Sequence, residues 1–126
     1  MDQPTFRKPR QYFDTAARPV HVTFDDGRAQ RRNFPWMHYV EARWEYFDQG
    51  TINVFIGDLL VVIVGSNLAP LFTAIEEQTL VRIRAQPDLA KDREHDPDSF
   101  ATDIRFFNTH EAPEANGQFE LNLGAD

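Results

Sequence analysis

The stretch IGDLLVVIVGSNLAPLF, residues 56–72, decides the fold that we expect for this chain. Six apolar residues, 59–64, stand in a row between Gly57-Asp58 and Gly65. A run that is apolar at every position predicts a central β-strand covered on both faces, by a helix, a second sheet or another subunit. Gly65 then predicts a tight corner into a helix over about residues 67–78, packed against the sheet.

The helix prediction depends on the spacing of its apolar residues and on its first turn. Ser66 or Asn67 is expected to cap the free N–H groups, and Pro70 lies in the first turn, where its missing donor costs nothing. The apolar stripe at i, i+3, i+4 and i+7 is Leu68, Leu71, Phe72 and Ile75.

Turn-forming residues predict further strands before and after this stretch. Gly57-Asp58 predicts a two-residue hairpin, and Asp25-Asp26-Gly27 predicts another turn because Asp bonds its own backbone and Gly accepts positive φ. Pro35 is expected to end a strand. The expected strands are residues 20–24, 28–34, 51–56, 59–64 and 81–85, with 104–106 as a candidate last strand.

Residues 36–47, WMHYVEARWEYF, fit two structures. One helical stripe would hold Trp36, Val40, Trp44 and Phe47. As a strand, apolar residues of 40–47 alternate with charged ones, and a turn signal follows. We favour the strand over 40–47, with a short irregular turn at 36–39.

These elements predict an α+β fold: a mainly antiparallel, curled or barrel-like sheet of five to seven strands with one packed helix. A purely parallel, doubly wound sheet is disfavoured because hairpins recur and one helix is found. We expect an extended N-terminal arm (1–19), a single domain (20–107) and an acidic polar tail (108–126). Phe119, Leu121 and Leu123 alternate in that tail and could dock part of it. The charged segment 87–99 is expected to be a solvated loop.

Composition limits the classes of function. The chain has 126 residues, 41% of them hydrophobic, no Cys and a net charge of −7. Residues 87–126 hold ten acidic and three basic side chains and carry the whole excess. An acidic chain repels nucleic acid at long range, and no thiolate metal site is available. Without a secretory h-region or a membrane-length apolar run, we expect a cytoplasmic protein.

No catalytic or phosphate-binding motif is complete. A P-loop needs a Lys after its second glycine, and a dinucleotide turn needs three glycines, whereas only Gly65 is present. Ser66 lacks the G-x-S-x-G pattern of a nucleophile elbow. Asp25 and Asp26 fit a turn better than a catalytic carboxylate pair. We therefore assign no catalytic or cofactor-binding residue and lean against an enzyme.

The histidines do not form a metal motif. His21, His38, His95 and His110 are far apart in the sequence, and none forms the close ligand pair that metal sites usually contain. His95 is flanked by acidic residues, and we expect it on a solvated face. No metal ligand is assigned.

Residues 63–68, IVGSNL, look like the second sequence motif of Sm-like RNA-binding proteins, in which a strand ends in an R-G-x-N-type turn. The resemblance implies an RNA contact at Gly65 and Asn67. The sequence departs from that family at Val64, where a basic residue is usual, and a helix is predicted where the family continues with a strand. The first Sm motif has no match upstream, and we infer no membership from six residues.

Three functions remain. The first is a non-enzymatic interaction module that self-associates, because one helix cannot cover both faces of a sheet built around 59–64. The second is a small ligand-binding or enzymatic domain with a pocket formed by Trp36, Tyr39 and Trp44, beside His38. The third is weak binding of RNA or single-stranded nucleic acid through Arg7 to Arg10 and Arg28 to Arg32, which have aromatic neighbours. Nucleic acid is the least expected of these partners, since edge protection by charge also explains the arginines.

Overall fold

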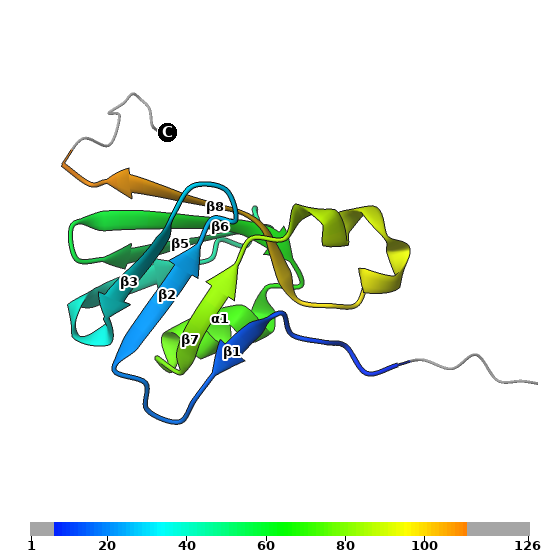
Figure 1. The fold of residues 1–126 in the computed structure, drawn as a ribbon, viewed down its shortest axis with the longest axis horizontal. Coiled ribbons are helices and arrows are strands. Elements are labelled where there is room, and N and C mark those ends of the chain that lie inside the picture. Colours follow the sequence, from blue (N-terminus) through cyan, green and yellow to red (C-terminus); the bar gives the residue numbers. More distant parts are fainter. Residues whose placement is uncertain (1–6, 111–126) are drawn as a thin grey trace, which may run out of the picture.

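Alternating apolar residues build two four-stranded sheets in the computed structural model, which describes residues 7–110 (Figure 1). The first sheet has the order β1 (Phe13–Thr15), β7 (Leu80–Arg84), β2 (His21–Asp25) and β3 (Arg31–Pro35). The second has the order β4 (Tyr39–Arg43), β5 (Thr51–Ile56), β6 (Leu59–Ser66) and β8 (Phe100–Asn108). Neighbouring strands pair antiparallel except β2 and β7, which are parallel.

The predicted α+β class with antiparallel sheets and one packed helix is confirmed for the described residues. The predicted single curled or barrel-like sheet of five to seven strands is not matched, because the eight strands of residues 7–110 divide into two sheets and form no closed barrel. The division occurs at Pro35. Here β3 ends, and the 3₁₀ helix η1 (Trp36–His38) turns the chain into the second sheet, with Trp36 buried and its backbone N–H bonded to Val20.

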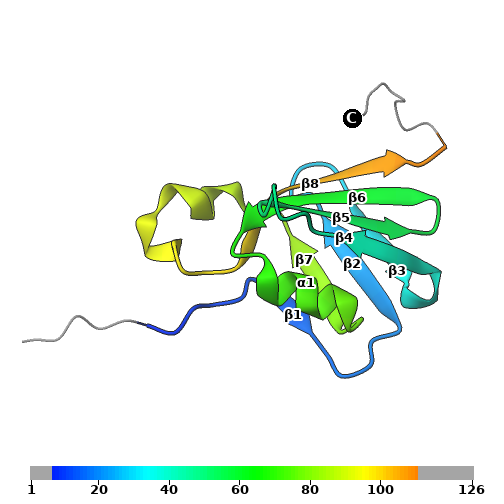
Figure 2. The same cartoon turned by 180° about the vertical axis from the view of Figure 1, so that it is seen from behind.

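Strand β6 occupies the central position that its apolar sequence predicts, between β5 and β8. The two-residue hairpin before it is present, and Gly57 has the positive φ (58°) that favours glycine. Val61 and Ile63 of β6 are fully buried against the first sheet. The alternate residues of β6 point to the other side, which Figures 1 and 2 show uncovered by any element of the described chain.

The single α-helix of residues 7–110, α1 (Ala69–Glu76), is shorter than predicted. Asn67 and Gln78, both with positive φ, lie just outside its two ends. Leu71, Ala74 and Ile75 pack into the core, and Figure 2 shows α1 in front of β7 of the first sheet, below β4. The predicted cap is wrong, because Leu68 is the N-cap residue and no side chain caps the helix.

Three predicted segments differ from the structure. The strand over 40–47 is shorter: β4 ends at Arg43 and the chain then turns. The solvated loop 87–99 contains two 3₁₀ helices, η2 (Pro87–Lys91) and η3 (Arg93–His95), and ends in the buried Asp98 and Ser99. The predicted arm supplies β1; its first six residues, and residues 111–126 of the predicted tail, lie outside the described chain.

Among the described residues, no helix is long and apolar enough to cross a membrane.

Candidate functional site

Gly65, the candidate phosphate-cradle residue, packs against protein backbone. Its N–H donates to the carbonyl of Gly50 (3.0 Å), and its Cα faces Phe100 and Ala101 of β8 at an irregularity in the β6–β8 register. A close strand contact therefore fills the space that an anion would need. Asn67 likewise faces protein, since its side-chain amide donates to the carbonyls of Asp96 (2.7 Å) and Asp98 (2.8 Å).

The Asp98 cluster joins the N-terminal segment of the described chain to the 87–99 segment. The buried Asp98 carboxylate accepts two bonds from the Arg7 guanidinium (2.8 and 2.6 Å) and one from the backbone N–H of Arg10 (2.8 Å). His95 Nδ1 lies 3.0 Å from Asp98 Oδ2 and 3.3 Å from the Tyr12 hydroxyl. The hydrogen bond from Arg7 holds the pKa of Asp98 well below its ordinary value, although burial opposes this.

This cluster corrects the prediction for His95. Its side chain is only 15% exposed, so it does not lie on a solvated face. Ser99, next to Asp98, has a buried hydroxyl that finds no hydrogen-bond partner within residues 7–110, so none of these residues acts as its base. We interpret the Asp98 cluster as a latch that fastens the N-terminal segment to the 87–99 segment.

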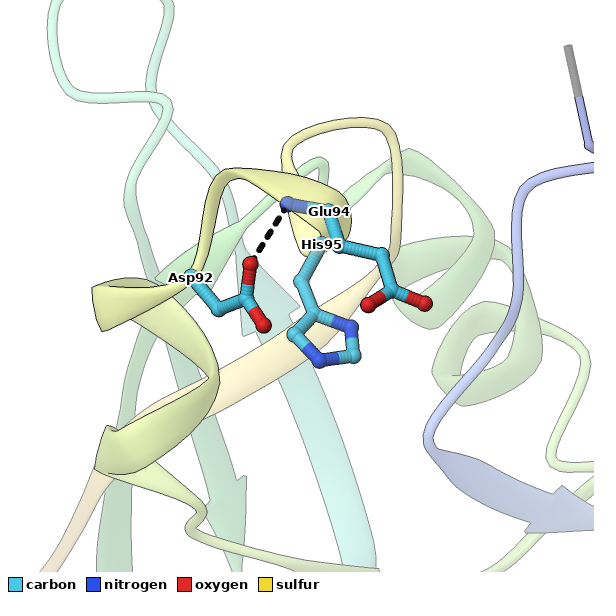
Figure 3. Close-up of side chains that lie close together, drawn as sticks. All are labelled: Asp92, Glu94 and His95. Atoms are coloured by element: carbon cyan, nitrogen blue, oxygen red, sulfur yellow. Dashed lines mark hydrogen bonds between the residues drawn. The ribbon is translucent and has the colours of Figure 1, made fainter.

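Figure 3 shows His95 between the carboxylates of Asp92 and Glu94, whose ligand atoms all lie within 4.8 Å of one another. Both carboxylates are exposed, and Asp92 already accepts a bond from the backbone N–H of Glu94 (3.0 Å). A loop adopts this arrangement without an ion. We therefore assign no metal here. The structure does not bring His21, His38 and His110 to this group.

The predicted carboxylate pair forms a turn. Asp26 is buried, and its Oδ1 accepts bonds from three successive backbone N–H groups, those of Arg28, Ala29 and Gln30. These donors lower the pKa of Asp26. The Asp25 carboxylate instead accepts a bond from the N–H of Gly27 (2.8 Å). Both groups are engaged with the backbone.

The outer face of the first sheet carries arginines. By the strand register, Arg84, Asp25 and Arg31 form one cross-strand row, and Arg82 lies in the next row beside Thr23. The aromatic neighbours that a single-strand surface would need, Phe13 and Phe34, pack against the core. Both are only partly buried, and Phe13 lines with Tyr12 a shallow hollow of about 300 Å³ beside Arg82 and Arg84. Positive charge and aromatic side chains therefore occur together at this end of the sheet.

The predicted aromatic pocket is not formed as a unit. Trp36 is buried, donates its indole N–H to the carbonyl of Leu80 (3.0 Å) and packs edge-on against Tyr39. Trp44 lies apart from them, against Phe72 of α1 (ring centroids 5.4 Å apart). His38 is exposed, and within residues 7–110 it forms no ion pair with a carboxylate.

The outer face of the second sheet is apolar. The register places Phe55, Leu60 and Phe107 in one cross-strand row. Val62 and Val64 lie in the next two rows that face the same side of the sheet. Phe107 and Val64 are 39% and 37% exposed, and the other three are partly exposed. We call these five residues the apolar outer face.

The chain matches no protein-family model, no curated protein and no solved structure.

Charged residues of both signs border the apolar outer face. Glu41 and Arg43 of β4 form an ion pair (2.9 Å) at one border, and Asp103 and Arg105 of β8 form another (2.7 Å) at the opposite border. The Arg43 guanidinium also lies over the Phe55 ring, 5.2 Å from its centroid. Arg28, in the turn between β2 and β3, also lies 3.8 Å from Asp103. Each border therefore carries both positive and negative groups.

Sequence reasoning predicted the central strands of this surface, but not how all of its residues come together. The run 59–64 already required cover on both faces, and the period-2 alternation of β5 placed Phe55 opposite the core residues. The last strand is predicted only around residues 104–106 and without a pairing register, so the place of Phe107 on this face does not follow from the sequence. The Asp98 cluster has no local signal, since Arg7 and Asp98 are 91 residues apart.

Proposed function

We propose that this chain is a non-enzymatic interaction module that self-associates through the apolar outer face. The observation that carries this proposal is the row of Phe55, Leu60 and Phe107 on a sheet face that no described element covers. Burial of contiguous apolar area is the main favourable term in association, and exposed patches of this kind mark interaction sites.

A second copy is the occupant that the charges favour. A two-fold interface brings the same surface together from both subunits, so the surface must be complementary to itself. The apolar outer face meets this condition, because its centre is apolar and both of its borders carry charges of both signs, which can pair across a two-fold axis. The arginine-bearing face of the first sheet meets it less well, because Arg31, Arg82 and Arg84 outnumber the carboxylates of Asp14 and Asp25 there.

The test is a substitution at the centre of the face. We expect Leu60→Lys to raise the dissociation constant of the dimer about 30-fold or more, as for a central interface residue worth about 2 kcal/mol. Sedimentation velocity over a range of concentrations measures it. Met37→Lys is the matched control, because Met37 is 85% exposed and lies outside the face.

A wild-type chain that stays monomeric at high micromolar concentration would contradict the proposal. So would a monomer in which residues 111–126 give nuclear Overhauser contacts to Phe107, since the chain itself would then occupy the face. Far-UV circular dichroism of both variants checks that each substitution leaves the fold intact.

A further inference from the structure

A second surface feature lies at the turn after β4. A hollow of about 400 Å³ separates this turn from the exposed side of α1. Trp44 and Phe72 line it with rings inclined at 38°, and Tyr46, 95% exposed, stands at its rim. The Trp44 indole N–H donates to the carbonyl of Gln49 (3.0 Å), which fixes the orientation of the ring. The aromatic surface is therefore held in place before any ligand arrives.

The charge of the hollow has one sign. Glu45 and Glu76 both line it, and none of its lining residues is Lys, Arg or His. Burial raises the pKa of Tyr39 nearby, and the negative charges of Glu76 and Glu41 add to that shift. The negative potential of Glu76 thus extends beyond the hollow itself.

We propose that this hollow binds an organic cation, of which a trimethylammonium or a guanidinium group is the kind that fits. Aromatic faces attract cations through their quadrupole, and Trp provides the strongest such face. The two carboxylates add Coulomb attraction and repel anions. A neutral apolar ligand would gain binding energy only from contact with the two aromatic rings. The hollow is separate from the apolar outer face, so the proposal stands independently of self-association.

The test uses choline and its neutral isostere 3,3-dimethylbutanol, with the indole N–H signals of the full chain as reporters in nuclear magnetic resonance. The chain has two Trp residues, and the buried Trp36 is the internal control. Choline is expected to shift the Trp44 signal saturably and to leave the Trp36 signal in place. The isostere is expected to produce a much weaker shift. Equal shifts from both compounds, or no shift of Trp44 with any cation, would overturn the proposal.

Two variants separate the charge from the ring. Glu76→Gln is expected to weaken choline binding by up to about 5-fold, as for a partly solvated charge pair. Glu77→Gln is the matched control, because Glu77 is exposed, adjacent and outside the hollow. Phe72→Leu is expected to weaken binding about 2- to 5-fold through loss of one aromatic face. Equal affinities for wild type, Glu76→Gln and Phe72→Leu would contradict the assigned site.

Two blocked amino acids identify the source of the cation. N-acetyl-trimethyllysine methylamide and N-acetylarginine methylamide present the two groups in the form that a protein partner would offer. Saturable binding of either supports the proposal, and the tighter one names the preferred group. A failure of both, with choline also inactive, excludes an organic cation.

Discussion

Gly65→Ala is expected to destabilise the fold by about 3 kcal/mol or more, at the upper end of what overpacking costs. A Cβ atom at this position would lie against the carbonyl oxygen of Phe100 and 2.9 Å from the Cα of Ala101. Both neighbours are backbone atoms of β8, so they cannot move away as the end of a flexible side chain would. The midpoint and slope of urea unfolding measure the loss.

Gly50→Ala is the matched control for this substitution. Its added Cβ would meet the carbonyl oxygen of Gly65 at 3.6 Å, an ordinary van der Waals contact. We expect a change within about 1 kcal/mol, of either sign, since the alanine also restricts the unfolded chain. Similar unfolding midpoints for the two variants would show that the close approach of β6 and β8 does not require glycine.

Asp98→Asn is expected to lower the melting temperature strongly. The amide cannot accept both bonds from the Arg7 guanidinium as a carboxylate does, and the cationic partner loses its counter-charge. Asp96→Asn is the control, because Asp96 is exposed and 3.9 Å from Arg93. We expect only a small change for the control. Equal melting temperatures for the two variants would contradict the role of the Asp98 cluster as a latch.

The same carboxylate makes stability dependent on pH in a defined direction. The pKa of Asp98 is lower in the folded chain than in the unfolded chain, where it is near 3.9. The unfolded state therefore takes up a proton first, and stability present above about pH 4 is lost as the pH falls below that value. Denaturant titrations at pH 7 and pH 3 should show a larger loss for wild type than for Asp98→Asn. An equal loss of stability in wild type and Asp98→Asn would show that other groups cause the acid sensitivity.

The strands and the class of the fold were accessible from the sequence because period-2 alternation and turn residues are local signals. Pro35 predicts the end of a strand, but nothing near it indicates that the next strand belongs to a different sheet. The sequence does not predict β1 for a similar reason. Its three residues form a strand only because they pair with β7, which is distant in the chain. Pairing partners over such distances are set by the packing of the whole core.

The surfaces that carry our proposals differ in how far a single sequence reveals them. The need for a covering partner followed directly from the composition of β6. The acidic aromatic hollow did not, because Trp44 and Phe72 are brought together only when α1 packs beside β4. Trp36, which the sequence placed in a pocket with Trp44, has its indole N–H bonded within the core, a distinction that depends on tertiary contacts.

The placement of β7 has a consequence for how the chain reaches this structure. The β5–β6 hairpin closes through a two-residue loop, so it can form within microseconds. The first sheet cannot form as quickly. Both β1 and β2 pair with β7, which comes more than fifty residues later in the chain. During synthesis the β2–β3 hairpin therefore lacks its neighbour until residues 80–84 have left the ribosome. Closure of that long loop is the step expected to limit the rate of folding.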